Sequence, residues 1–160
     1  MAHKLLVALD ASEGAWRAVE YVADTFGQVP GAQVTLMHIL TGLPPAFWDD
    51  GHILDPEERK RRQKLVTAWQ EEQEKAWRAL VRKAGERLAK GGFSGKAVAS
   101  KFKPRYYDVA EDLISEAETG GFGTIVMGRR GLGKAKSLLL GSVATKVVQS
   151  ARACAVTVVQ

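Results

Sequence analysis

The chain has 160 residues, of which 46% are hydrophobic and 26% charged, with a net charge of +5 and a pI of about 9.4. These values are ordinary for a globular protein, and we expect a single domain over residues 1–160. The single cysteine excludes an intrachain disulfide, and no apolar run has the length of a membrane span, so we expect a cytoplasmic protein without membrane contact.

The excess of basic residues raises the question of nucleic-acid binding. Basic residues are spread along the chain except for two short runs at 59–64 and 129–136. Neither run is interleaved with aromatic residues, and a solvated face or attraction to a phosphorylated small molecule explains the charge equally well. We therefore do not expect a nucleic-acid partner, an alternative that only the pI supports. One cysteine and three scattered histidines also give no metal-ligand spacing.

The first part of the chain is predicted to form a strand, a helix and a second strand. KLLVALD at 4–10 is an almost continuous apolar run, typical of a strand buried on both faces. Residues 13–27 have one apolar helical face, and Ser12 can cap that helix. QVTLMHIL at 33–40 predicts another buried strand, and a loop with two prolines follows at 41–54.

A long helix is predicted next. Asp55, Pro56 and Glu58 form a helix start, with a capping residue, a proline at the first position and a glutamate that can complete a capping box. The helix runs for roughly 35 residues, about 50 Å, to the glycine pair 91–92. Its predicted apolar face consists of Leu65, Trp69, Ala76, Leu80, Ala84 and Leu88. The first two turns have no apolar stripe, so we expect them to project into solvent or to reach a partner.

The second half of the chain continues the alternation of strands and helices. Strands are predicted at 96–103, 123–128 and 155–160, and helices at 106–119 and from Gly141 to Arg152. This order predicts an α/β fold, with a parallel sheet and helices on both faces. The last strand would lie at an edge, and AVTVVQ has no charge to prevent pairing, so we expect a homodimer through residues 155–160.

The stretch GRRGLGKAKSLLLGS contains the candidate ligand-binding residues. Its first residues nearly match a Walker phosphate loop, but the stretch follows the fourth strand, and Ala135 replaces the magnesium-binding Ser or Thr. The remaining pattern is G-x2-G-x9-G-S, formed by Gly128, Gly131, Gly141 and Ser142. Glycines allow backbone amides to approach a phosphate, and a helix N-terminus favours an anion.

Asp10 ends the first predicted strand. Ligands of open parallel sheets bind beyond the carboxyl ends of the strands, so Asp10 and Gly128 converge if the first and fourth strands are neighbours. An aspartate in this position can also simply cap the next helix, and Ser142 can be a helix cap as well as part of an anion site. Both interpretations remain open at this point.

Together these motifs resemble the universal stress protein family. VALDAS at 7–12 is similar to the first strand and loop of the family, and LMHIL at 36–40 to its second strand. TIVMGRRG, LLLGSVATKVV and CAVTVV follow in the family's order. The resemblance implies a Rossmann-like, adenine-nucleotide α-hydrolase-like domain with strand order 3-2-1-4-5, often homodimeric. It also implies bound ATP, or ADP or AMP, with or without Mg²⁺.

The resemblance further implies which residues surround the nucleotide. Those contributed by the ends of the first two strands are Ala8, Asp10 and Ile39, the last through its backbone beside adenine. Those near the ribose and the phosphates are Met127, Gly128, Gly131, Gly141, Ser142 and Val143. Among the basic side chains of this stretch, Arg130 is the favoured charge partner.

The chain departs from the family pattern in two places. The third strand ends in KFKPRYYD, with Pro104 but without the family's glycine, so residues 105–107 leave the shape of the pocket rim open. The segment 41–64 is longer and more charged than expected, which suggests a lid or a partner surface. Within it, we expect Phe47 and Trp48 to fold back onto the protein's own core.

The resulting hypothesis is a nucleotide-binding regulatory protein of the stress response. The sequence has no visible catalytic constellation, so we expect at most slow ATP hydrolysis. Two alternatives remain: a nucleotide-free dimeric scaffold of the same family, and an ATP-dependent enzyme of similar architecture. The intact glycine motif argues against the first, and the lack of a glycine-serine loop after the first strand argues against the second.

Overall fold

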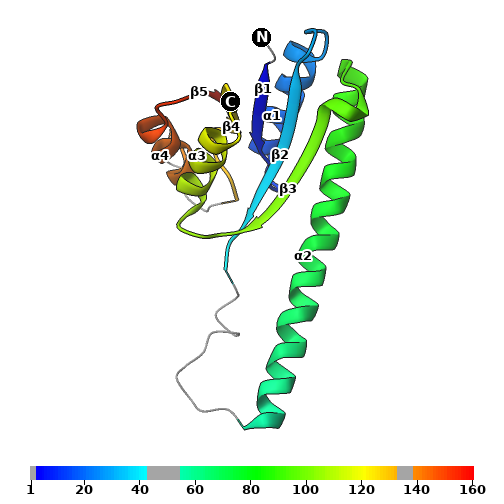
Figure 1. Cartoon of the computed structure of the whole chain (residues 1–160), viewed down its shortest axis with the longest axis vertical. Coiled ribbons are helices and arrows are strands. Elements are labelled where there is room, and N and C mark those ends of the chain that lie inside the picture. Colours follow the sequence, from blue (N-terminus) through cyan, green and yellow to red (C-terminus); the bar gives the residue numbers. More distant parts are fainter. Residues whose placement is uncertain (1–2, 43–54, 133–138) are drawn as a thin grey trace.

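The computed structural model describes residues 3–42, 55–132 and 139–160. Its strands are β1 (Lys4–Ala8), β2 (Gln33–Leu40), β3 (Val98–Pro104), β4 (Thr124–Gly128) and β5 (Ala155–Val159). Its α-helices are α1 (Glu13–Phe26), α2 (Pro56–Gly91), α3 (Val109–Thr119) and α4 (Ser142–Ser150). The strands form one parallel sheet in the order β3-β2-β1-β4-β5, with helices on both faces (Figure 1). The predicted fold class and strand order are confirmed.

The central strand β1 is buried on both faces of the sheet. Leu5 and Val7 pack on the face covered by α1 and α2, whereas Leu6 packs on the face covered by α3 and α4 (Figure 1). Each of these side chains is at most 1% exposed. Burial on two sides explains why the sequence of this strand is a continuous apolar run rather than an alternating one.

Two elements begin two or three residues later than predicted. The third strand begins at Val98, because Gly95–Ala97 form a 3-10 turn, η2, immediately before it. The helix that follows begins at Val109, because the side chain of Asp108 accepts a backbone amide of the first turn and caps the helix there.

The predicted start of α2 is confirmed in detail. The Asp55 carboxylate accepts the amides of Glu57 and Glu58 at 2.8 and 2.9 Å, and the Glu58 carboxylate accepts the amide of Asp55 at 3.3 Å. This reciprocal pair is a capping box. At the other end, Gly92 adopts a left-handed conformation with φ 118°, which ends the helix.

The packed face of α2 differs from the prediction. The buried residues are Trp77, Ala84 and Leu88, all in the second half of the helix, which packs on α1 and β3. Leu65 and Ala76, which we predicted on the apolar face, are exposed. The N-terminal half of α2 instead extends past the carboxyl edge of the sheet (Figure 1). Within the described ranges, no helix combines the length and apolarity needed to cross a membrane.

Candidate functional site

A cleft of about 390 Å³ opens at the carboxyl ends of β1, β2 and β4. It lies where the strand order reverses, because the chain proceeds from β1 to β2 on one side and returns through β4 on the other. Its volume is within the usual range for small-molecule sites. The structure places all ten predicted site residues along this cleft: Ala8, Asp10, Ile39, Met127, Gly128, Arg130, Gly131, Gly141, Ser142 and Val143.

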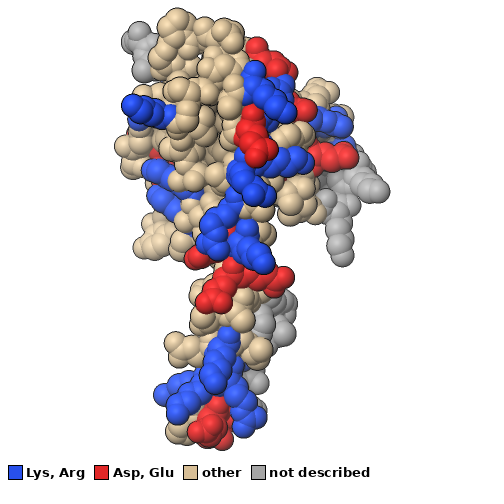
Figure 2. Space-filling view, turned by 90° about the vertical axis from the view of Figure 1, so that its right-hand side faces the viewer, with Lys and Arg blue, Asp and Glu red and all other residues tan. Residues whose placement is uncertain are grey.

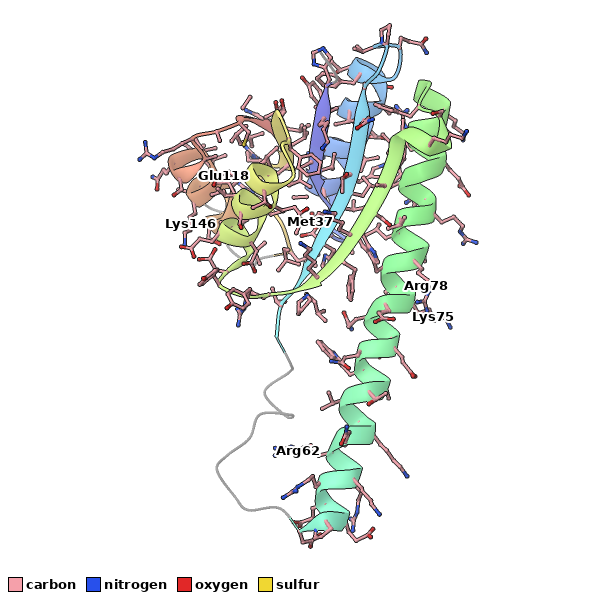
Figure 3. All side chains as sticks on the ribbon, in the orientation of Figure 1. Met37, Arg62, Lys75, Arg78, Glu118 and Lys146 are labelled. Carbon is pink, nitrogen blue, oxygen red and sulfur yellow. The ribbon has the colours of Figure 1, made fainter. Side chains whose placement is uncertain are left out.

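One end of the cleft is apolar. Met37, Ile39 and Met127 belong to the strands and are at most 5% exposed, and Val109 and Leu113 of α3 complete the wall. Figure 3 shows Met37 directed from β2 toward α3. We did not predict that α3 contributes to the wall of the cleft. The sequence shows that this helix has an apolar face, but it does not show which strands that face covers. An apolar group suits this end of the cleft.

The other end is built from glycines and the N-terminus of α4. The amide of Gly141 donates to the carbonyl of Arg129 at 2.9 Å, which pins the loop after β4 to the start of α4. Gly141 is the N-cap of α4 and no side chain caps this helix, so the interpretation of Ser142 as its cap is wrong. The free amides of a helix N-terminus favour an anion.

Asp10 stabilises the turn that leads into α1. Its Oδ1 accepts the amide of Ser12 at 2.8 Å, and the Ser12 hydroxyl in turn accepts the amide of Ala15 at 3.1 Å and caps the helix. The helix cap is therefore Ser12, and Asp10 supports it. Oδ2 faces the glycine loop, 3.1 Å from the position that a Cβ on Gly131 would occupy.

Gly128 also has a packing role that sequence reasoning did not identify. A Cβ on Gly128 would lie 2.3 Å from the carbonyl carbon of Gly14, and a Cβ on Gly14 would lie 2.5 Å from the carbonyl oxygen of Arg130. The first turn of α1 therefore packs directly on the backbone at the end of β4. The sequence shows both glycines, but only the tertiary structure shows that they touch.

We expect Gly128→Ala to lower the free energy of unfolding by roughly 1–2 kcal/mol, because backbone must move to accept the methyl group. Urea unfolding followed by circular dichroism measures this loss. Gly95→Ala is the control, since a Cβ there meets nothing within 4 Å, and its effect should remain within about 0.5 kcal/mol. Equal stability of the two variants would contradict the proposed close contact.

His38 lines the cleft as well and was not predicted as a site residue. Its Nδ1 lies 3.0 Å from the carbonyl oxygen of Leu9, which requires the proton to be on Nδ1. The ring stacks on Phe102 with centroids 5.6 Å apart and lies 5.7 Å from the ring of Trp77. This aromatic cluster connects the cleft with the point where α2 leaves the body.

An ion cluster holds α3 and α4 together beside the cleft. Lys146 of α4 donates to Asp108 and, at 2.7 Å, to Glu111 (Figure 3 labels Lys146). The hydrogen bond from Lys146 is the main reason that the pKa of Asp108 lies below its ordinary value, and the hydrogen bond to Asp108 raises the pKa of Lys146. The cluster is exposed, so its effect on stability is modest.

The fold and the cleft together define a class of protein. An open, doubly wound parallel sheet with a ligand-sized cleft at its switch point is the architecture of α/β ligand-binding proteins. The universal stress protein family matches residues 1–160, and the chain belongs to this family.

Individual relatives agree with this assignment. The universal stress protein YxiE of Bacillus subtilis is 25% identical over 150 residues, covering 93% of each chain. The solved structure of the hypothetical protein MJ0577 matches with a TM-score of 0.71 and 22% identity, covering 100% of this chain and 98% of that one. A universal stress protein from Archaeoglobus fulgidus, solved in complex with dAMP, matches with a TM-score of 0.60 and 19% identity, covering 100% and 98%. At these identities the two structures support the fold alone.

Proposed function

We propose that this universal stress protein binds ATP, or the related ADP or AMP, and acts as a nucleotide-dependent regulator of the stress response. The observation that carries the proposal is the convergence of the predicted residues on one cleft with an apolar end and a glycine-lined end. An apolar wall suits a base, and glycine backbone beside a helix N-terminus suits phosphates. The dAMP complex of the Archaeoglobus relative supports the choice of an adenine nucleotide.

The proposed orientation follows from the two ends of the cleft. The base would lie against Met37 and the backbone of Ile39, and the phosphates would lie toward Gly131 and Ser142. Arg130 also lines the cleft on the phosphate side and supplies positive charge there. In this orientation Asp10 lies between the two ends, close to the sugar.

The cleft residues would bind Mg²⁺ only together with the phosphates of the nucleotide. Asp10 is the one carboxylate among the cleft residues that the structure describes, and residues 3–42, 55–132 and 139–160 contain no cluster of three or more His, Cys, Asp or Glu suited to a metal. Mg²⁺ is commonly held by one or two carboxylates together with substrate phosphates. Asp10 could supply such a ligand, and the metal would neutralise phosphate charge.

The proposal also includes the oligomeric state, the cellular location and the rate of hydrolysis. β5 ends the sheet, and its residues 156–159 are only partly buried, which supports pairing with the same strand of a second copy. A single cysteine is compatible with the cytoplasm. We propose at most slow hydrolysis of the bound nucleotide, so the output would be a change of state rather than a product.

Isothermal titration with ATP tests the central proposal. We expect saturable binding of one ATP per chain, weaker binding of AMP, and no binding of GTP at the same concentration. Chromatography of the supernatant from denatured protein should also reveal any adenine nucleotide that was co-purified. A folded protein that gives no heat with ATP or AMP and releases no nucleotide would favour the dimeric scaffold without nucleotide.

A further inference from the structure

The N-terminal half of α2 is a projecting arm, which we define as residues 56–76. The helix has 36 residues, but its buried residues begin only at Trp77. At 1.5 Å per residue the arm is roughly 30 Å long. The arm residues are exposed or, like Val66 and Trp69, only partly buried, and Asp55 caps the helix at its far end. A helix with so little packing is marginal in water. Such a helix is suited to a partner.

The charges of the arm form bands along its length. The first turn contains Glu57 and Glu58. The basic band that follows, at 59–64, contains Arg59, Lys60, Arg61, Arg62 and Lys64, and the acidic band at 71–74 contains Glu71, Glu72 and Glu74, with Lys75 after it. Figure 2 shows a mainly basic tip with a small acidic patch at its end, a central band that is largely uncharged, and an acidic band above it. The central band includes Leu65, which is 56% exposed. The charge distribution of one arm is therefore complementary to that of a second arm that runs in the opposite direction.

One face of the arm has the spacing of a coiled-coil seam. Arg61, Leu65, Ala68 and Glu72 recur at intervals of four, three and four residues. Lys64 and Glu71 flank them. All six side chains are exposed, and within the described part of the chain the four charged ones form no ion pair. This arm face lies on a different side of the helix from the stripe that packs on the body.

We propose that this arm face binds the same face of a second copy, with the two helices antiparallel. A two-fold axis between Val66 and Thr67 places Leu65 opposite Ala68 of the second copy. It also places Arg61 opposite Glu72, and Lys64 beside Glu71. A parallel arrangement would instead bring the basic bands together and the acidic bands together, which is unfavourable.

The length of the arm agrees with this register. The same axis brings Pro56 of each helix level with Trp77 of the other, which is where the body of that copy begins. The arms then overlap over their whole length. β5 lies at the opposite edge of the sheet from β3, on which α2 packs, so the two proposed contacts are independent (Figure 1).

Disulfide cross-linking tests the register directly. In a Cys154→Ser background, Leu65→Cys protein is mixed with affinity-tagged Ala68→Cys protein and oxidised, and cross-linked heterodimer is measured on a non-reducing gel. We expect severalfold more heterodimer than from the matched control mixture of Thr67→Cys and Glu74→Cys, two exposed positions on another side of the arm. Equal yields from the two mixtures would overturn the proposal.

Charge reversal tests the complementarity. R61E/K64E and E71K/E72K should each sediment more slowly than wild type, because like charges then oppose each other, and an equimolar mixture should recover the wild-type behaviour. R59E/K60E, with the same charge change as the first variant but at exposed residues off the arm face, should sediment like wild type. Failure of the mixture to recover would refute arm pairing. Retention of a DNA duplex by wild type but not by R61E/K64E, with unchanged sedimentation, would assign the arm to nucleic acid instead.

Discussion

Gly131→Val should abolish adenine-nucleotide binding while leaving the fold intact. Gly131 is exposed and its backbone does not have a positive φ, so the backbone conformation at this position does not require glycine. Its Cβ would lie 3.1 Å from Oδ2 of Asp10, and the two methyl groups would extend into the space proposed for the ribose and phosphates. We expect at least a 100-fold weaker Kd for ATP, about 3 kcal/mol.

Titration calorimetry with ATP measures this effect, and urea unfolding verifies that the variant remains folded. Gly95→Val is the matched control, because it makes the same substitution at an exposed glycine far from the cleft, where a Cβ has no neighbour within 4 Å. It should bind ATP like wild type. Unchanged affinity in a folded Gly131→Val protein would show that the glycine loop is not the phosphate site.

The double variant Lys101→Met/Lys103→Met should have a free energy of unfolding about 3 kcal/mol lower than wild type at pH 7. This value is near the lower end of the usual loss when a buried ion pair is broken, because the lysines are partly exposed. Glu116 of α3 is only 6% exposed and is hydrogen-bonded by both lysines of β3, which are 42% and 50% exposed. Removing the lysines leaves a buried carboxylate without its partners. Urea unfolding of both proteins measures the difference.

The pH dependence gives this prediction a second readout. Burial of Glu116 opposes its ionisation, but the hydrogen bonds from the two lysines outweigh burial, so its pKa lies below the ordinary value. In wild type, the resulting stability is present above the ordinary glutamate pKa and is lost as pH falls through the lowered pKa of the folded state. In the double variant only burial remains, which raises the pKa of Glu116.

The variant should therefore regain part of its deficit relative to wild type as the pH falls from about 7 to about 5, because protonation removes the buried charge. Adding Glu116→Gln to the double variant should remove this recovery, since glutamine does not titrate. A deficit that stays constant over this pH range would indicate that Glu116 is not responsible for it.

Local sequence patterns determined the elements and their order. Apolar runs such as KLLVALD indicated buried strands, and Asp55 with Pro56 and Glu58 indicated the start of α2, because capping depends on neighbouring residues only. The alternation of strands and helices then predicted the parallel sheet. The resemblance of the glycine spacing to a known family supplied the site residues, which the structure places along one cleft.

Other features depended on contacts between residues far apart in the chain. The sequence indicated that α2 is long, but only its packing on α1 and β3 showed that Trp77 is the first buried residue and that Leu65 stays exposed. The contact of Gly14 with Gly128 likewise arises from the position of α1 against β4. Periodicity and capping act within a few residues and are visible in the sequence, whereas these contacts exist only once the sheet has assembled.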